Sequence, residues 1–394
     1  MFEVTEVDPG RDENWAVRSA QFSRRAGSVW LTACPAGSAA ETLGARPARG
    51  EDDAVTAELI ARCRAGDADA FRELVEPFRR ELLVHCYRFL GSMHDAEDAL
   101  QETLFDAWRG FSAFEARSAV RTWLYRVATN RCLKVLRAAG RRPRMAIPGT
   151  SAAGLELPEP SAHGEVVWLE PCPDVLLDGV PDTAPGPEAR YESKQAISLA
   201  FVTAVQLLPP RQRAVLILRD VLGYRAADVA EFLDATEESV TSALKRARAG
   251  IRAQTSRCGA TQPPPPPDSP GERQLVDGLT RAFESGDVDG VVALLADDVR
   301  LTMPPLPAEY LGREAVTRLL AAVFHRITSY RMVATRANSQ PAFGVYLLDR
   351  HTATWRATGL LVLTLAADRI AAVTRFENSH LPRFGLPRTL PPDH

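Results

Sequence analysis

Cysteine is scarce in this sequence, and the few cysteines lie far apart. Six occur in 394 residues, and no two have the Cys-x-x-Cys spacing of a zinc site. This scatter indicates reduced, structural thiols rather than a metal centre or a set of disulfides. We therefore expect neither a bound metal nor another cofactor.

Long apolar runs are also missing. The longest, residues 359–367, is far shorter than the ~20 residues that a membrane-spanning helix needs. The N-terminus carries Glu3, Glu6 and Asp8 where an export signal would have positive charge and then an apolar stretch. We expect a cytoplasmic protein with no membrane partner.

Common enzyme motifs are absent as well. The sequence has no phosphate-binding glycine loop, no Gly-x-Ser-x-Gly motif and no zinc motif. Its formal net charge is only -3, so any binding of nucleic acid must depend on local clusters of positive charge.

Proline content and hydrophobic periodicity divide the chain into segments. Residues 1–52 lack sustained periodicity and predict a poorly ordered extension. Apolar residues recur at helical spacing through 53–142 and again through 193–257, so two all-α modules are expected. Between them, residues 143–192 are rich in proline and predict an extended linker.

The last part of the chain has a different architecture. Five consecutive prolines, 263–267, form the centre of a stiff spacer at 258–271. Residues 272–387 begin with helical patterns and continue with four strand-like segments between Tyr330 and Glu377. Helices followed by a run of strands predict an α+β domain rather than a doubly wound sheet.

Charge is sharply separated within the first module. Between Gly91 and Ala107 there are five acids and no lysine or arginine; between Arg117 and Arg144 there are nine basic residues and no acid. An acidic helix suits a basic protein surface, and a basic helix suits phosphates. The alternative is two solvated faces that pair with each other.

Aromatic residues lie inside the basic stretch. Trp123 and Tyr125 are followed by Asn130 one to two helical turns later. Basic residues interleaved with aromatic rings form a stacking surface for unpaired bases. A place for Trp123 in the hydrophobic core is the alternative.

The second module has the pattern of a helix-turn-helix. A helix follows Pro209 and Pro210, a turn follows at Gly223, and Thr236 is a suitable N-cap for a later helix. That later helix is apolar on one face and carries hydroxyl and basic side chains on the other, which fits the major groove of DNA. An ordinary helical hairpin is the alternative.

Three segments together are typical of one family. They are HDAEDALQETLFDAW (His94 to Trp108), RTWLYRVATNRCL (Arg121 to Leu133) and LPPRQRAVLILRDVLGYRAADVAEFLDATEESVTSALKRAR (Leu208 to Arg248). They resemble regions two and four of the extracytoplasmic-function (ECF, group four) sigma factors, and the likeness extends over residues 55–257. The resemblance implies promoter-specific initiation of transcription, with core RNA polymerase and promoter DNA as partners.

The resemblance also implies roles for three sets of side chains. The acidic helix would dock on the largest polymerase subunit through Asp95, Glu97, Asp98, Gln101 and Glu102. The basic helix would open and hold the minus-ten element through Trp123, Tyr125, Arg126, Asn130, Arg131 and Lys134. The recognition helix would contact the minus-thirty-five element through Ser239, Thr241, Ser242, Lys245, Arg246 and Arg248. Many family members carry arginine at the positions of Thr241 and Ala243, so a different promoter sequence is expected here.

The C-terminal segment resembles SnoaL-like domains, which have a cone-shaped α+β fold. The segments VVWLEPCPD (Val166 to Asp174) and TMPPLPAEYLGREAV (Thr302 to Val316) look typical of sigma factors with such a fusion. Folds of this type can hold a catalytic pocket, and side chains that could line one are Tyr310, His325, His351, Trp355, Glu377 and His380. Nothing in the sequence brings two of them together, so we expect no enzyme activity.

The expected protein is therefore multidomain, with two all-α sigma-factor modules and an α+β SnoaL-like domain. We expect that domain to contact the linker or the modules and to regulate them; the sequence leaves open whether it binds a small molecule. Two other hypotheses remain at this point: a bifunctional protein with a C-terminal isomerase or hydrolase, and an operator-binding repressor with a ligand-sensing domain. A repressor should bind duplex DNA alone and as a symmetric dimer, whereas a sigma factor needs core polymerase. The acidic helix and the long linker favour the sigma factor.

Overall fold

The computed structural model describes residues 49–115, 119–139, 157–164, 168–177, 196–255, 263–326 and 329–392. The chain divides into Met1–Val55 and one compact unit, Thr56–His394, and the contacts given below lie within the second unit. Residues 1–48 of the predicted extension and most of the predicted linker at 143–192 lie outside the described residues. Residues 49–52, which were expected to belong to the extension, are helical instead.

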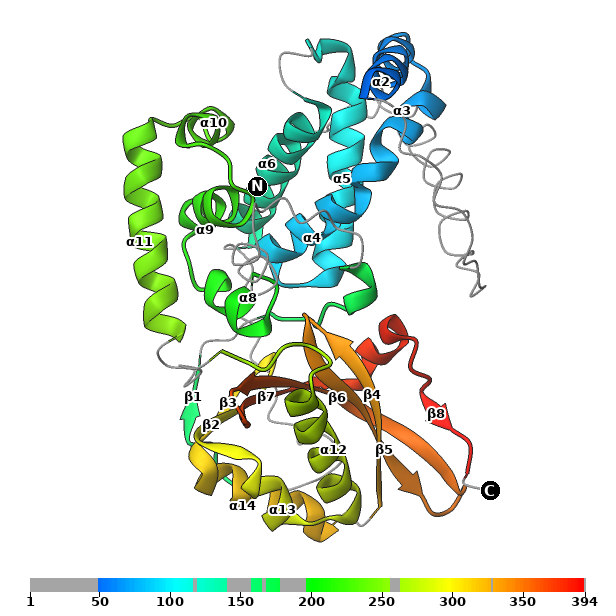
Figure 1. Cartoon of the computed structure of the whole chain (residues 1–394), viewed down its shortest axis with the longest axis vertical. Helices are drawn as coiled ribbons and strands as arrows, with labels where there is room; N and C mark the ends of the chain where they lie inside the picture. Colours follow the sequence, from blue (N-terminus) through cyan, green and yellow to red (C-terminus); the bar gives the residue numbers. More distant parts are fainter. Residues whose placement is uncertain are drawn as a thin grey trace, which may run out of the picture. The chain divides into compact units, whose positions relative to one another are not determined.

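The first module is helical, as the periodicity predicts. It comprises α2 (Arg49–Arg64), α3 (Ala68–Val75), α4 (Arg79–Leu90), α5 (Met93–Gly110) and α6 (Val120–Ala139) (Figure 1). Gly91 ends α4 with a φ of 73°, a left-handed conformation that suits glycine. The hydroxyl of Ser92 then caps α5 by accepting a hydrogen bond from the backbone N of Asp95 at 3.1 Å. This tight junction sets the angle at which the acidic helix leaves α4.

The second module contains the predicted helix-turn-helix. Its helices are α8 (Leu199–Gln206), α9 (Pro210–Leu216), α10 (Ala226–Phe232) and α11 (Glu237–Thr255). The first helix of the motif ends as an α-helix at Leu216 and continues as a π-helical turn at Ile217–Val221, before the expected turn at Gly223. The hydroxyl of Thr236 accepts from the backbone N of Ser239 at 3.2 Å and so begins α11 as expected.

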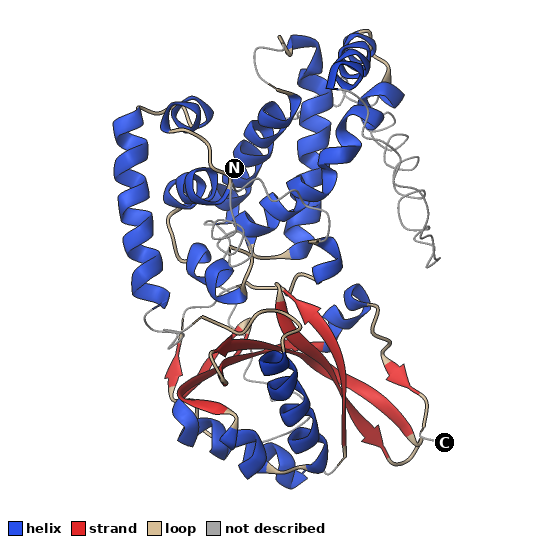
Figure 2. Ribbon diagram, viewed as in Figure 1, coloured by secondary structure: helices blue, strands red, loops and turns tan. Residues whose placement is uncertain are grey.

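The C-terminal domain is α+β, with a mixed sheet and helices on one face (Figures 1 and 2). Its helices are α12 (Pro270–Ser285), α13 (Val288–Ala293) and α14 (Gly312–Arg326). Its strands are β1 (Ala162–His163), β2 (Leu295–Met303), β3 (Leu306–Leu311), β4 (Tyr330–Ala337), β5 (Gln340–Asp349), β6 (Thr354–Ala366), β7 (Arg369–Glu377) and β8 (Thr389–Leu390). The strand order is β1-β3-β2-β7-β6-β5-β4, with β8 beside β6 and β2 parallel to β7.

The space between the helices and this sheet is a hydrophobic core. The rings of Phe283, Phe324 and Tyr330 meet there with centroid distances of 4.9 to 5.2 Å. Apolar side chains of β2, β5, β6 and β7 complete the cluster. The sheet therefore has one face against its own helices, and its other face is available to the rest of the chain.

The described parts of the predicted linker pack against the C-terminal domain. Strand β1 pairs with β3, with Ala162 opposite Glu309 and His163 opposite Ala308. Further along, Pro173 forms a bridge with Ala337 at the end of β4. Strands β3 and β4 lie near opposite edges of the sheet, so the linker is attached to this domain at two separate places.

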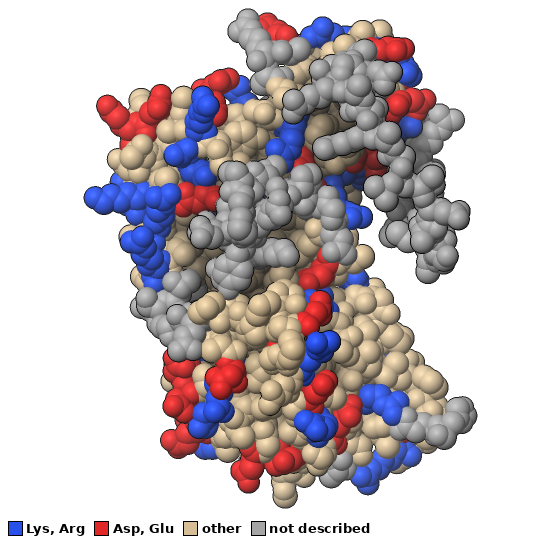
Figure 3. Space-filling view, in the orientation of Figure 1, with Lys and Arg blue, Asp and Glu red and all other residues tan. Residues whose placement is uncertain are grey.

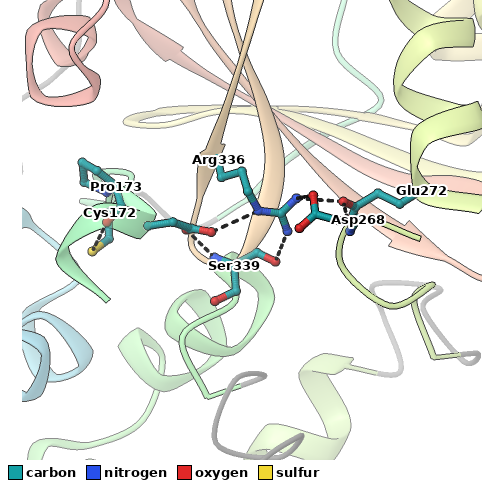
Figure 4. A network of polar contacts seen from close by, with 7 residues as sticks. Cys172, Pro173, Asp268, Glu272, Arg336 and Ser339 are labelled. Carbon is teal, nitrogen blue, oxygen red and sulfur yellow. Dashed lines mark hydrogen bonds and ion pairs between the residues drawn. The ribbon is translucent and has the colours of Figure 1, made fainter. Parts of the chain in front are cut away.

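A partly buried polar cluster fixes the second attachment (Figure 4). The guanidinium of Arg336, on β4, donates to the Asp174 carboxylate of the linker at 3.3 Å and to Glu272 of α12 at 2.7 Å. The backbone N of Ser339 also donates to Asp174, at 2.7 Å. Because both acids are at least three-quarters shielded from water, the cluster ties the linker to this domain more firmly than an exposed ion pair would.

Candidate nucleic-acid and protein interfaces

The acidic helix α5 presents its expected docking residues unevenly. Asp98 and Gln101 are exposed, whereas Asp95 is half-buried and its backbone N donates to the helix cap. Glu102 is exposed but forms an ion pair with Arg131 of α6 at 2.8 Å. On this helix, Asp98 and Gln101 are therefore the side chains most available to a basic partner.

Glu97, the remaining acid of this set, is held by the C-terminal domain. The guanidinium of Arg383 donates to its two carboxylate oxygens at 2.6 and 3.1 Å. Arg383 lies in a 3-10 segment, Asn378–Phe384, that packs against β6. A two-pronged guanidinium–carboxylate contact of this kind is directional as well as attractive. The geometry thus joins α5 to a residue 286 positions later in the sequence.

The basic helix α6 pairs in part with α5. Arg131 forms ion pairs with Glu102 at 2.8 Å and with Asp106 at 2.7 Å. At Arg131, therefore, the acidic and basic helices pair with each other, as the alternative interpretation of their charges predicts. Asn130 and Lys134 remain exposed on the same helix.

The aromatic residues of α6 are packed rather than presented to solvent. The ring of Trp123 lies against Phe111 and Phe114, with centroids 5.6 and 5.0 Å away. Tyr125 is only 2% exposed, and its ring contacts the edge of His85 at 4.9 Å. Burial raises the pKa of the Tyr125 hydroxyl, which stays protonated. In this arrangement the ring of Tyr125 offers no free face to a base, and the ring of Trp123 is half-buried.

The second module supplies the cover over Tyr125. Tyr224, in the turn before α10, approaches the Tyr125 ring with a centroid distance of 6.2 Å. Arg126, the next residue of α6, forms an ion pair with Glu231 of α10 at 3.1 Å. Buried Arg213 of α9 donates to the carbonyl of Phe89 at the end of α4, at 2.5 Å. The two helical modules are therefore packed against each other over part of the expected minus-ten surface, at Tyr125 and Arg126.

The recognition helix α11 has an open outer face. Ser239, Thr241, Ser242, Lys245, Arg246 and Arg248 are all exposed. Two of them already have partners, because the Thr241 hydroxyl donates to the carbonyl of Glu237 at 2.9 Å and Arg248 contacts both carboxylate oxygens of Asp220 at 2.7 and 2.8 Å. Ala243, at one of the positions where many family members carry arginine, is buried.

A buried asparagine connects the modules, the linker and the C-terminal domain. Asn338, in the turn between β4 and β5, is 0% exposed. Its amide NH2 donates to the hydroxyl of Tyr87 at 2.8 Å and to the carbonyl of Ile197 at 2.7 Å. Its side-chain and backbone groups also exchange two hydrogen bonds with the backbone of Cys172, both 2.8 Å long. Sequence reasoning missed this residue, because asparagine is common in hairpin turns that need a positive φ, here 57°.

The linker also contacts the junction between α4 and α5. The backbone N of Glu170 donates to the carbonyl of Gly91 at 2.9 Å, and its carboxylate accepts from the backbone N of His94 at 3.0 Å. The hydroxyl of Tyr87 donates to the carbonyl of Glu170 at 2.8 Å. The linker thus lies between the first module and the C-terminal domain, hydrogen-bonded to both.

The six side chains considered for a catalytic pocket differ in their surroundings. His325, His351 and Glu377 are exposed, and the Tyr310 hydroxyl donates to the carbonyl of Pro158 in the linker. His380 is half-buried, and burial lowers its pKa. The ring of buried Trp355 packs beneath the guanidinium of Arg331 at 4.7 Å. Within the described part of the chain, no hydrogen bond joins two of these six residues.

The structure gives no sign of a metal centre or a membrane helix in the part that it describes. Among those residues no group of three histidine, cysteine, aspartate or glutamate side chains could hold a metal ion. No helix that can be followed there is long and apolar enough to cross a bilayer.

Comparison with known families assigns the three folded parts. Residues 74–142 match sigma-70 region 2, residues 198–250 match sigma-70 region 4, and residues 276–377 match the SnoaL-like domain. The SigJ sigma factor of Mycobacterium tuberculosis has a similar fold, with a TM-score of 0.50 and 23% identity over 79% of this chain and 97% of that one.

Full-length relatives agree with these assignments. The chain is 29% identical to SigJ of Mycobacterium tuberculosis over 64% of this chain and 72% of the relative. It is 40% identical to the ECF RNA polymerase sigma factor SigG of Mycobacterium tuberculosis over 341 residues, which cover 83% of this chain and 86% of that protein. With an acidic helix, a basic helix, a helix-turn-helix and a C-terminal α+β domain in the same order, the chain belongs to the ECF family of RNA polymerase sigma factors and carries a C-terminal SnoaL-like domain.

Proposed function

We propose that this sigma factor is held closed by its own C-terminal domain and opens when it binds core RNA polymerase. Sigma factors are non-enzymatic initiation factors that bind core polymerase and promoter DNA. In this chain, α5 is the proposed docking helix, α6 the minus-ten surface and α11 the minus-thirty-five surface. A protein with these partners acts beside the chromosome, so the proposal places it in the cytoplasm.

The ion pair between Glu97 and Arg383 carries this proposal. It occupies one carboxylate of the docking helix with an arginine of the C-terminal domain. A basic polymerase surface would compete for the same carboxylate, because one carboxylate cannot satisfy two guanidinium groups in the same geometry. At Glu97, the contact with polymerase and the contact with the C-terminal domain are therefore alternatives, so polymerase binding favours release of the domain.

The packing of the helical modules supports the same conclusion. Tyr125 and Arg126 need to reach promoter bases and phosphates, yet Tyr224 and Glu231 of the second module contact them. Asn338 connects that second module, the first module and the linker to the C-terminal sheet. Release of the C-terminal domain would remove these bonds together, and the closed arrangement would lose their contribution to its stability.

The test is the affinity of the full chain for core polymerase. We expect Arg383→Ala to bind polymerase about fivefold more tightly, because the lost ion pair contributed about 1 kcal/mol to the closed state alone. Arg388→Ala, an exposed arginine of the same domain, is the matched control and should leave the affinity unchanged. Glu97→Ala should weaken binding, and Arg383→Ala should give no gain when added to it.

Transcription gives a second readout. Run-off transcription by holoenzyme that contains Arg383→Ala should begin at lower sigma-factor concentration than with the wild type. Unchanged affinity and unchanged run-off transcription would show that the domain does not regulate. Truncation at Cys258 is a coarser test, because it also uncovers linker residues such as Leu169 and Cys172 that are buried in the whole chain.

A further inference from the structure

The outer face of α11 begins with a carboxylate. Val240, Leu244 and Ala247 are buried and define the inner face of this helix. At about 100° per residue, Glu238, Ser242, Lys245 and Ala249 form the stripe opposite that inner face. All four are exposed. Thus Glu238 is the first side chain on the surface that faces away from the protein.

The neighbouring glutamate has a different position. Glu237 lies on the flank of α11 together with Thr241 and Arg248. The carbonyl of Glu237 accepts the Thr241 hydroxyl, and Arg248 is tied to Asp220 on the π-helical turn. This flank is therefore directed along the protein, and only Glu238 of the two glutamates extends from the outer stripe.

The charges along α11 change from its beginning to its middle. Figure 3 shows acidic side chains where α10 meets α11 and basic side chains further along α11. A bare helix N-terminus attracts phosphate, because its free N–H groups and its dipole favour negative charge. Two glutamates in the first turn already satisfy that preference and repel a DNA phosphate. Phosphate contacts on this helix are thus left to the basic side chains further along it, which begin with Lys245 and Arg246.

The chemistry of a carboxylate restricts which base edge it can meet. In a helix-turn-helix, the N-terminal residues of the recognition helix contact base edges in the major groove. An ionised carboxylate only accepts hydrogen bonds, so it is repelled by guanine O6 and N7 and by thymine O4. The cytosine amino group N4 is the donor that glutamate recognises there.

We propose that Glu238 selects a cytosine in the minus-thirty-five element by accepting a hydrogen bond from the N4 amino group. This inference rests on the proposed role of α11 in promoter recognition. Ser242, one turn later on the same stripe, adapts to either a donor or an acceptor, and Lys245 lies beyond it towards guanine or phosphate. Along the stripe, the acceptor Glu238 is followed by the hydroxyl of Ser242 and then by the cation of Lys245. This order sets the direction in which α11 would lie along the minus-thirty-five element.

The experiment uses holoenzyme assembled from core polymerase and the full chain. Promoters with a randomised upstream element are transcribed, and the transcribed templates are sequenced. Wild-type holoenzyme should enrich cytosine at one upstream position about tenfold, as a good amino-acid–base contact contributes roughly 1–3 kcal/mol. Glu238→Ala should lose the preference at that position alone. Glu238→Gln should shift it to adenine, since glutamine pairs with adenine N6 and N7.

Glu237→Gln is the matched control, because it changes the adjacent glutamate by the same chemistry. It should leave the selected sequence unchanged. If Glu238→Ala selects the same bases as the wild type, the assignment of Glu238 is wrong while promoter recognition stands. A preference for adenine in the wild type that Glu238→Ala abolishes would also overturn the choice of cytosine. If the wild type starts no transcript from any promoter, the proposed function fails with it.

Discussion

The two helices proposed to contact promoter DNA, α6 and α11, differ in access rather than in composition. Both carry basic side chains next to hydroxyl or aromatic ones. The expected reading residues of α11 are exposed, whereas Tyr125 of α6 is 2% exposed and Arg126 is paired with Glu231. The difference arises because α10 and the turn before it pack on α6 and leave the outer face of α11 free. The residue composition of a helix thus indicates that DNA is a suitable partner, whereas the tertiary packing determines whether the DNA can reach the helix.

The largest effect on this difference should come from Asn338. Asn338→Gly removes the side-chain bonds to Tyr87, Ile197 and Cys172 but keeps a residue that accepts a positive φ. We expect the free energy of unfolding to fall by about 3 kcal/mol, because three buried partners lose a hydrogen bond. Hydrogen exchange should then rise in α6 and become similar to that of α11. Asn378→Ala, which removes one bond near the surface, is the control.

Low pH should destabilise the region around α6 more than the region around α11. His85, buried beneath Tyr125, has its pKa lowered to about 3 by burial and by the charge of Arg88. Because the unfolded chain binds this proton near pH 6.5, stability is full above that pH and is lost as the pH falls towards 3. At pH 5 the loss should be about 2 kcal/mol. Denaturant unfolding at pH 7 and pH 5 measures it, and His85→Gln should remove this part of the pH dependence.

A substitution at Tyr224 can expose part of the Tyr125 ring while the C-terminal domain stays in place. Tyr224→Ala should uncover the ring of Tyr125 and raise the affinity of the free chain for single-stranded minus-ten DNA about tenfold, the range expected for one stacked base. Fluorescence anisotropy with a labelled oligonucleotide measures this affinity. Glu231→Gln, which removes only an exposed ion pair, should change it less than twofold. Equal effects of the two variants would mean that charge, not the ring, closes the surface.

The smallest effect should come from the open helix. Asp220 holds Arg248 in an exposed ion pair, so Asp220→Asn should free one cation on α11. We expect about twofold tighter binding of holoenzyme to promoter duplex and a salt dependence steeper by about one counterion. A titration of promoter binding against salt concentration measures both. No change in slope would place Arg248 away from the phosphates.

Sequence periodicity was sufficient for the helical modules and for most of the C-terminal domain. The helix-turn-helix could be predicted because Pro210, Gly223 and Thr236 are local signals for helix start, turn and cap. Strands β4 to β7 were predicted from alternation. Strand β3 was missed because it follows two prolines and contains Pro307, and β1 and β8 because two residues carry no period.

The contacts between distant parts could not be predicted in this way. Tyr125 and Tyr224 are separated by about a hundred residues, and Glu97 and Arg383 by nearly three hundred. Neither pair has a local signal, since an arginine in a short 3-10 segment can pair with a carboxylate from any part of the chain. The proline-rich linker was predicted to be extended from its composition, and a contact with the C-terminal domain was expected without naming residues. Its bonds to Arg336 and Asn338 depend on groups contributed by the C-terminal sheet.

Because β1 pairs with β3, the C-terminal domain is built from two separate segments of the chain. Its sheet takes a strand from before the second helical module as well as strands from after it. In topological terms, the DNA-reading module is an insertion within a discontinuous domain, rather than the segment that precedes an appended tail. A single cut between α11 and α12 would therefore leave two fragments that remain associated through β1 and the Arg336 cluster. If the C-terminal domain regulates the modules as proposed, a cut at that site would not by itself release them, and activation would require a rearrangement of these contacts.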